Sequence, residues 1–123
     1  MDTSTFEGKK GARVEADRRC ASAPRELLER VIDYFHPRRI ILFGSRARGE
    51  ATDDSDTDLL VILDDDAPKA HLTLRAGWES RRGYNRATDV IPVRASVYDR
   101  RAKIAGTLAY EAAIDGIAVY ERG

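Results

Sequence analysis

The chain has 123 residues, a length that suits one domain and excludes two full-sized ones. Its hydrophobic content of 42% and charged content of 34% are typical of a soluble globular protein. Acidic and basic residues balance at 21 each, so no net field favours direct binding of nucleic acid or of a membrane surface. The single cysteine excludes an internal disulfide, and no apolar run approaches the ~20 residues of a membrane-spanning helix. We therefore expect a cytoplasmic protein.

The first elements in chain order are an extension and a helix. Residues 1–22 are polar and lack a clear period, which predicts a flexible N-terminal extension with at most a helical turn around Val14. Residues 23–123 form the predicted domain. Within it, apolar residues recur at helical spacing over residues 23–37, and Pro37 ends the predicted helix.

Two short apolar runs follow, at residues 39–43 and 59–63, and each predicts a buried strand. Unbroken runs of this kind suit a sheet that is covered on both faces. Residues 67–83 are predicted to be a helix that ends at a glycine. Its apolar face should carry Ala70, Leu74 and Trp78, and we expect the tryptophan to lie in the core or in an interface rather than under a nucleobase.

A third strand is predicted over residues 88–94. Pro92 cannot donate a backbone hydrogen bond, so this strand should lie at a sheet edge or carry a bulge. Ser96 and Asp99 then resemble a capping box that opens a further helix.

The chain closes with a predicted helix over residues 106–116 and a predicted strand over residues 117–121. Strands and helices alternate along the chain. The predicted fold class is therefore α/β, with a small mixed sheet and flanking helices.

Several residues that are able to bind a phosphate group follow the first predicted strand. Gly44 allows a ligand to approach the backbone closely, and Ser45 follows it where a helix N-terminus would offer free N–H groups to a phosphate. Arg46 and Arg48 carry forked donors that fit phosphate oxygens. Taken alone, this stretch is equally compatible with a simple turn that carries surface arginines.

Two carboxylates, Asp56 and Asp58, stand at the start of the second strand. Residues two apart in a strand point to the same side, so the two carboxylates should lie close together. Like charges at that distance repel each other unless a cation lies between them, and Mg²⁺ takes carboxylates together with phosphate oxygens. A solvated acidic loop is the alternative interpretation of this pair alone.

A third carboxylate is the usual requirement when two metal ions clamp the attacking and leaving oxygens of a phosphoryl-type transfer. Asp89 is the candidate, because it opens a strand that is able to lie beside the one after Asp58. Its alternative role is to cap the end of that strand.

The combined pattern resembles the minimal nucleotidyltransferases, or MNT-type domains, of the DNA polymerase β superfamily. The family motif is Gly-Ser, ten residues, then Asp-x-Asp, and here Gly44 and Ser45 are followed by residues 46–55 and then by Asp56 and Asp58. The resemblance covers roughly residues 25–121 and implies a polymerase-β-like nucleotidyltransferase fold.

The resemblance also implies an activity: transfer of a nucleoside monophosphate from a nucleoside triphosphate, here expected to be ATP, with two Mg²⁺ ions and release of pyrophosphate. Gly44 and Ser45 would hold the triphosphate, and Arg46 and Arg48 would neutralise phosphate charge. The three aspartates, Asp56, Asp58 and Asp89, would be the catalytic metal ligands, and Asp89 would help to activate the acceptor hydroxyl.

Three functions remain open. In the first, the chain has no room for an acceptor-binding domain, and the resemblance implies an antitoxin that attaches AMP to a tyrosine of a partner HEPN-type toxin. In the second, the chain is a nucleotide-binding interaction module without turnover. In the third, it is a small-molecule nucleotidyltransferase, acting on an aminoglycoside-like acceptor bound between the subunits of a homo-oligomer.

Overall fold

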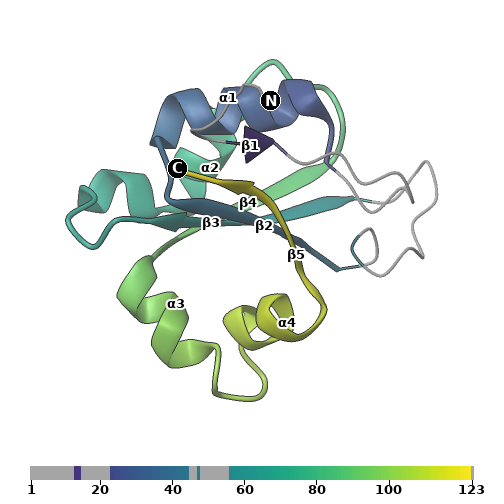
Figure 1. Ribbon diagram of the computed structural model, residues 1–123. Helices are drawn as coiled ribbons and strands as arrows, with labels where there is room; N and C mark the ends of the chain where they lie inside the picture. Colours follow the sequence, from purple (N-terminus) through teal and green to yellow (C-terminus); the bar gives the residue numbers. More distant parts are fainter. Residues whose placement is uncertain (1–12, 15–22, 45–46, 48–55, 123) are drawn as a thin grey trace.

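The computed structural model describes residues 13–14, 23–44, 47 and 56–122. These residues form one five-stranded sheet with two helices on each face (Figure 1). The elements in chain order are β1 (Arg13–Val14), α1 (Arg25–Phe35), β2 (Arg39–Phe43), β3 (Thr57–Leu63), the 3₁₀ helix η1 (Lys69–Leu72), α2 (Leu74–Ser80), β4 (Thr88–Arg94), α3 (Ala95–Arg101), α4 (Leu108–Asp115) and β5 (Ile117–Glu121).

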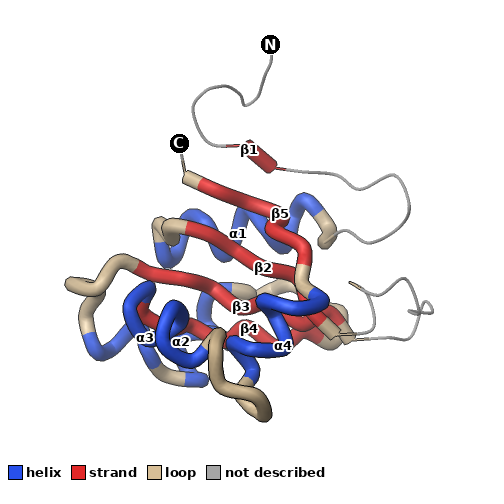
Figure 2. Tube along the Cα trace, turned by 60° about the horizontal axis from the view of Figure 1, so that its bottom comes forward, coloured by secondary structure: helices blue, strands red, loops and turns tan. Residues whose placement is uncertain are grey.

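The strands lie in the order β1-β5-β2-β3-β4 (Figure 2). β2 runs antiparallel to both β3 and β5, whereas β3 and β4 are parallel, so the sheet is mixed as the sequence predicted. β4 is an edge strand, which confirms the prediction made from Pro92. Around Val14 the structure has a strand paired with β5 in place of the expected helical turn.

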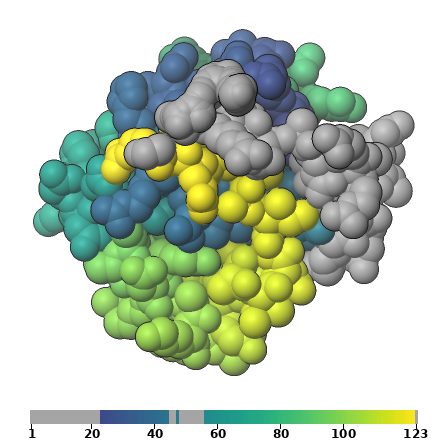
Figure 3. All heavy atoms as spheres, viewed as in Figure 1, coloured from purple at the N-terminus to yellow at the C-terminus, as the bar shows by residue number. Residues whose placement is uncertain are grey.

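Each face of the sheet is covered by its own core. Leu59, Val61 and Leu63 of β3 pack with α1 and α2, and the alternate residues Leu60 and Ile62 pack with α3 and α4. All five are buried, so the unbroken apolar run correctly indicated a strand that is covered on both sides. In the space-filling view, the green and yellow atoms of α3 and α4 form one lobe beneath the sheet (Figure 3).

α1 follows the predicted pattern: Leu27, Leu28, Val31 and Phe35 are buried on one face. The helix ends at Phe35, and His36 takes a left-handed conformation (φ 48°) whose backbone N–H donates to the Ile32 carbonyl. The buried Pro37 follows directly, as expected of a residue that cannot continue a helix.

The helix predicted over residues 67–83 is split. The 3₁₀ helix η1 ends at Leu72, and the hydroxyl of Thr73 then accepts a hydrogen bond from Ala76 N at 3.0 Å, so that α2 begins only at Leu74. The predicted core face is also wrong: Leu74 is 76% exposed and Trp78 49% exposed. Small residues pack inward instead, namely Ala76, Gly77 and Ser80.

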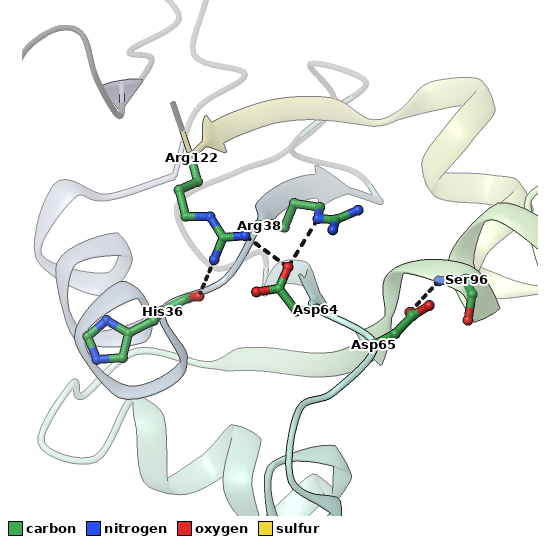
Figure 4. Close-up of polar contacts among 6 residues, drawn as sticks. All are labelled: His36, Arg38, Asp64, Asp65, Ser96 and Arg122. Atoms are coloured by element: carbon green, nitrogen blue, oxygen red, sulfur yellow. Dashed lines mark hydrogen bonds and ion pairs between the residues drawn. The ribbon is translucent and has the colours of Figure 1, made fainter.

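The predicted capping box at the start of α3 does not form. The backbone N–H of Ser96 instead donates to the Asp65 carboxylate at 2.9 Å, from the loop after β3 (Figure 4). One residue earlier in that loop, Asp64 accepts hydrogen bonds from Arg122 at 2.8 Å and from Arg38 at 3.2 Å. These contacts tie the end of β3 to the segments that enter β2 and leave β5.

Candidate active site

The site begins where β2 ends beside the start of β3. Phe43 is the register partner of Asp58, and the next residue, Gly44, has a φ of 80°. A Cβ atom added at Gly44 would collide with Oδ2 of Asp58. Glycine is therefore required here for two reasons, the left-handed backbone and the close approach of a carboxylate. Gly44 begins the segment for which the sequence predicted contact with a phosphate group.

The parallel pairing of β3 and β4 brings two of the predicted carboxylates together. Asp58 and Asp89 are register partners, and they follow another pair of partners, the buried Thr57 and Thr88. Because facing residues in a ladder project to the same side, both aspartates stand on the face that α3 and α4 cover. Asp56 lies two residues before Asp58 and is exposed.

The electrostatics reflect this crowding. The pKa of Asp58 is raised to about 6, first by burial, then by the charges of Asp89 and Asp56 and by a hydrogen bond with Asp89. The charge of Glu111, in the first turn of α4, adds a smaller contribution. Repulsion and desolvation both disfavour the charged carboxylate. The three aspartates named from the sequence thus form one cluster in space.

Glu111 also contributes negative charge near Asp58, and its pattern in the sequence did not predict this. An acidic residue in the first turn of a helix is common, because it interacts favourably with the helix dipole. Only the placement of α4 against the sheet brings its charge near Asp58.

The donor set is suited to a divalent cation. Mg²⁺ prefers hard oxygen ligands such as carboxylates. A bound cation would also relieve the repulsion between the negatively charged aspartates. Within residues 13–14, 23–44, 47 and 56–122, no group of three or more His, Cys, Asp or Glu side chains is arranged to hold a metal ion. The aspartates therefore suit Mg²⁺ by the type of their ligand atoms, and not by an arrangement that already matches a coordination shell.

The remaining predicted site residues, Ser45, Arg46 and Arg48, lie outside the described part of the chain. Of the two described residues that flank Ser45 and Arg46, Ala47 donates its backbone N–H to the Gly44 carbonyl at 3.1 Å.

Two cavities adjoin the strands that carry the aspartates. One, of about 250 Å³, is lined by Asp89 itself and its neighbours on β4, and by Leu74, Trp78 and Arg81 in and just after α2. The other, of about 330 Å³, lies against Leu60 and Ile91, each two residues beyond an aspartate, and is closed by residues around α3 and α4.

No helix in the described part of the chain is long and apolar enough to cross a membrane.

Comparison with known proteins identifies the family of the chain. A family model of the nucleotidyltransferase domain matches residues 24–112, which include every aspartate of the cluster. A solved structure from Sulfolobus solfataricus, of a candidate nucleotidyltransferase, is similar with 23% identity and a TM-score of 0.47, over 76% of this chain and 72% of that one. A search of curated proteins gave no match. Since the family model spans most of the chain, the protein belongs to the nucleotidyltransferase domain family.

Proposed function

We propose that the protein transfers a nucleoside monophosphate, with ATP as the donor, to an acceptor hydroxyl in a Mg²⁺-dependent reaction. The observation that carries this proposal is the pairing of Asp58 with Asp89 across β3 and β4, with Asp56 and the Gly44 turn beside it. Nucleotidyltransferase domains generally use nucleotide substrates and divalent metals, and this cluster has the matching donor chemistry.

Each residue then has a role. Asp56, Asp58 and Asp89 would hold Mg²⁺, which neutralises the developing charge on the phosphate oxygens. Gly44 leaves the backbone open to the triphosphate, and we assign Ser45, Arg46 and Arg48 to phosphate contacts on the motif alone. Asp89 takes the proton of the acceptor hydroxyl as its oxygen attacks the α-phosphorus. The bond from that phosphorus to the bridging oxygen breaks, and pyrophosphate leaves with the electron pair.

We further propose that the acceptor is a tyrosine of a HEPN-type toxin, so that the protein is the antitoxin of the pair. The support for this finer proposal is the resemblance of the central motif to MNT-type domains. The test combines the purified protein, ATP, Mg²⁺ and the product of the neighbouring gene, followed by intact mass measurement. A gain of one AMP on the neighbour that disappears with Asp58→Asn supports the proposal. A competent enzyme that neither binds nor modifies that neighbour overturns the antitoxin role.

A second candidate, a binding module that acts without turnover, is favoured by one observation. Ile114 is 63% exposed on α4, and the nearby Ile104 and Leu108 are about half exposed, so the α3–α4 side offers apolar surface. The Asp58→Asn variant distinguishes the two functions. It would still neutralise the partner protein if binding alone were sufficient, and it would fail to do so if nucleotidyl transfer were required.

A further inference from the structure

A cavity of about 330 Å³ lies beside β3 and β4, on the face of the sheet that α3 and α4 cover (Figure 1). Leu60, Ile91 and Ala109 line it, and all three belong to the hydrophobic core of that face. Because alternate residues of a strand point to the same side, Asp58 and Asp89 project to this face as well. We call this space the α3–α4 cavity, and it shares one side of the sheet with the carboxylates.

The α3–α4 cavity and Gly44 lie on opposite sides of the aspartate pair. Leu60 and Ile91 each follow an aspartate of the pair by two residues, which is about 7 Å along the strands. Gly44 lies in the other direction, because β2 runs antiparallel to β3 and ends beside Asp58. The proposed function places the triphosphate at Gly44. In an in-line displacement the attacking oxygen enters opposite the leaving pyrophosphate, so the acceptor approaches from the side of the cavity.

The cavity offers one charged group to an occupant. Its described lining includes two polar residues, Arg101 and Thr107. The Thr107 hydroxyl contacts two backbone carbonyls, at 2.8 and 2.9 Å, and accepts from the Tyr110 N–H at 3.1 Å, so these contacts already occupy it. Arg101 is exposed, and its guanidinium only donates. Because Arg100 and Lys103 are exposed close by, an acidic group suits this end of the cavity and a polycationic acceptor does not.

Apolar surface continues from the cavity to the outside of the molecule. Leu108 lines the cavity and is 46% exposed, and Ile104, in the connection before it, is 50% exposed. Residues 91–93 also line the cavity, and they are partly exposed on the edge strand β4. A small molecule that filled the cavity would leave the outer apolar surface in water. A protein segment would cover both parts, which favours a protein as the occupant.

We propose that the α3–α4 cavity binds a large apolar side chain that neighbours the acceptor hydroxyl in a protein segment, and that Arg101 pairs with an acidic residue of the same segment. Residues two apart in an extended segment lie about 7 Å apart on one side, which matches the step from Asp89 to Ile91. Arg101 and Leu108 are then specificity-determining residues. They select the sequence around the acceptor residue, whichever residue carries the hydroxyl.

This inference rests on the proposed function for the position of the acceptor. In that reaction the acceptor oxygen bonds to the α-phosphorus and its proton passes to Asp89. The bond from phosphorus to the bridging oxygen breaks, and pyrophosphate leaves. Arg101 and Leu108 touch none of the reacting atoms, so they should affect binding of the acceptor segment more than the rate of the chemical step.

Peptide binding without ATP or metal tests the cavity by itself. Three short peptides share a central position that is an equal mixture of Tyr, Ser and Thr. The first peptide has leucine two positions to either side and glutamate at both ends. The second replaces glutamate by lysine, and the third replaces leucine by serine. Isothermal titration calorimetry with the full chain should give the first peptide a Kd at least about tenfold lower than the other two.

Two variants and two matched controls locate the binding. Arg101→Glu should reverse the preference between the glutamate and lysine peptides, which loss of folding would not produce. Arg100→Glu, one residue earlier and outside the described lining, should keep the wild-type preference. Ala109→Leu should fill the cavity and weaken binding of the first peptide about tenfold. Ala113→Leu, at an exposed position of the same helix, should bind like the wild type.

Transfer is followed separately, with ATP and Mg²⁺, by peptide mass. The first peptide should gain a nucleoside monophosphate with the lowest KM of the three. Arg101→Glu should raise that KM about tenfold, with a smaller effect on kcat, and the lysine peptide should become the better acceptor for this variant.

The outcomes separate the two proposals. Equal transfer to all three peptides, or an unchanged preference in Arg101→Glu, overturns the role of the cavity and leaves nucleotidyl transfer standing. The expected binding preferences without transfer to any peptide or to the neighbouring gene product overturn the transfer reaction and leave the cavity as a binding site for such a segment. Tighter binding of ω-hydroxydecanoate than of any peptide, or self-association that Arg101→Glu abolishes in sedimentation, assigns the cavity to a small molecule or to a second copy and overturns the proposal. Absence of peptide binding also overturns it.

Discussion

Asp58 and Asp89 face each other across the parallel strands β3 and β4, although they lie far apart in the chain. Their proximity, with Asp56 nearby, contributes to raising the pKa of Asp58 to about 6, after the larger effect of burial. Replacing one of these aspartates by a neutral residue would remove charge repulsion and would increase the free energy of unfolding. The cluster is therefore the part of the molecule where function and stability make opposite demands.

The first prediction concerns Asp58→Asn. The folded protein binds the Asp58 proton more tightly than the unfolded chain does, so ionisation of this group destabilises the fold as pH rises from its ordinary pKa of 3.8 through about 6. Above that range the variant should be more stable than the wild type by about 1 kcal/mol, allowing for solvent screening at a partly exposed group. Below the ordinary pKa, the difference should vanish. Thermal unfolding at several pH values, without metal, checks this; equal stability at pH values above about 6 would contradict it.

The second prediction concerns Gly44→Ala. The added Cβ would meet the Asp58 carboxylate, on top of the cost of a left-handed backbone, about 1–2 kcal/mol. Gly106→Ala is the matched control, because Gly106 has a φ of 93° and nothing within 4 Å of an added Cβ. Both variants should lose stability in chemical denaturation. Only Gly44→Ala should also lose nucleotidyl transfer, by at least about tenfold, since it displaces the carboxylate of Asp58, to which we assign metal binding. Equal activity in the two variants would show that the contact is unimportant.

The third prediction concerns Gly77→Ala in α2. Alanine favours a helix by about 1 kcal/mol over glycine, but here its methyl group would collide with the Val90 carbonyl. We expect a net destabilisation of about 1–3 kcal/mol because the helix must move off β4. Differential scanning calorimetry measures the outcome. A higher melting temperature would mean that α2 moves without cost.

The fourth prediction concerns the contacts of Asp64 in Figure 4. The hydrogen bond from Arg122, followed by smaller contributions from both arginine charges, lowers the pKa of Asp64, and burial opposes it. The stabilisation is therefore complete above the ordinary pKa of 3.8 and is lost as pH falls through the lower folded value. Asp64→Asn should thus be less stable than the wild type near neutral pH.

The pH profile of that difference gives the check. Melting temperatures of the wild type and of Asp64→Asn should converge in acid, whereas Asp99→Asn, an exposed position on α3, should follow the wild type throughout. A constant gap at every pH would mean that the variant acts through packing and not through charge.

Local pattern was enough to predict much of this protein. The runs at residues 40–43 of β2 and 59–63 of β3 are short, apolar and rich in branched side chains, which favours strands buried on both faces. The spacing from Gly44 to Asp56 and Asp58 was enough to predict the family. Pro92 predicted an edge strand or a bulge, because a missing backbone donor is a local property, and β4 lies at the edge of the sheet.

Other features depend on which segments meet, and no local period encodes that. The direction of β4 makes Asp89 the partner of Asp58, and the placement of α4 brings in Glu111. The helix predicted through residue 78 had a plausible apolar face, yet the close approach of α2 to β4 requires small residues inward, which turns Trp78 outward. The sequence by itself determined the chemistry of the carboxylates and the strands that carry them. Tertiary structure decided their register, because register and close packing are set by contacts between distant parts of the chain.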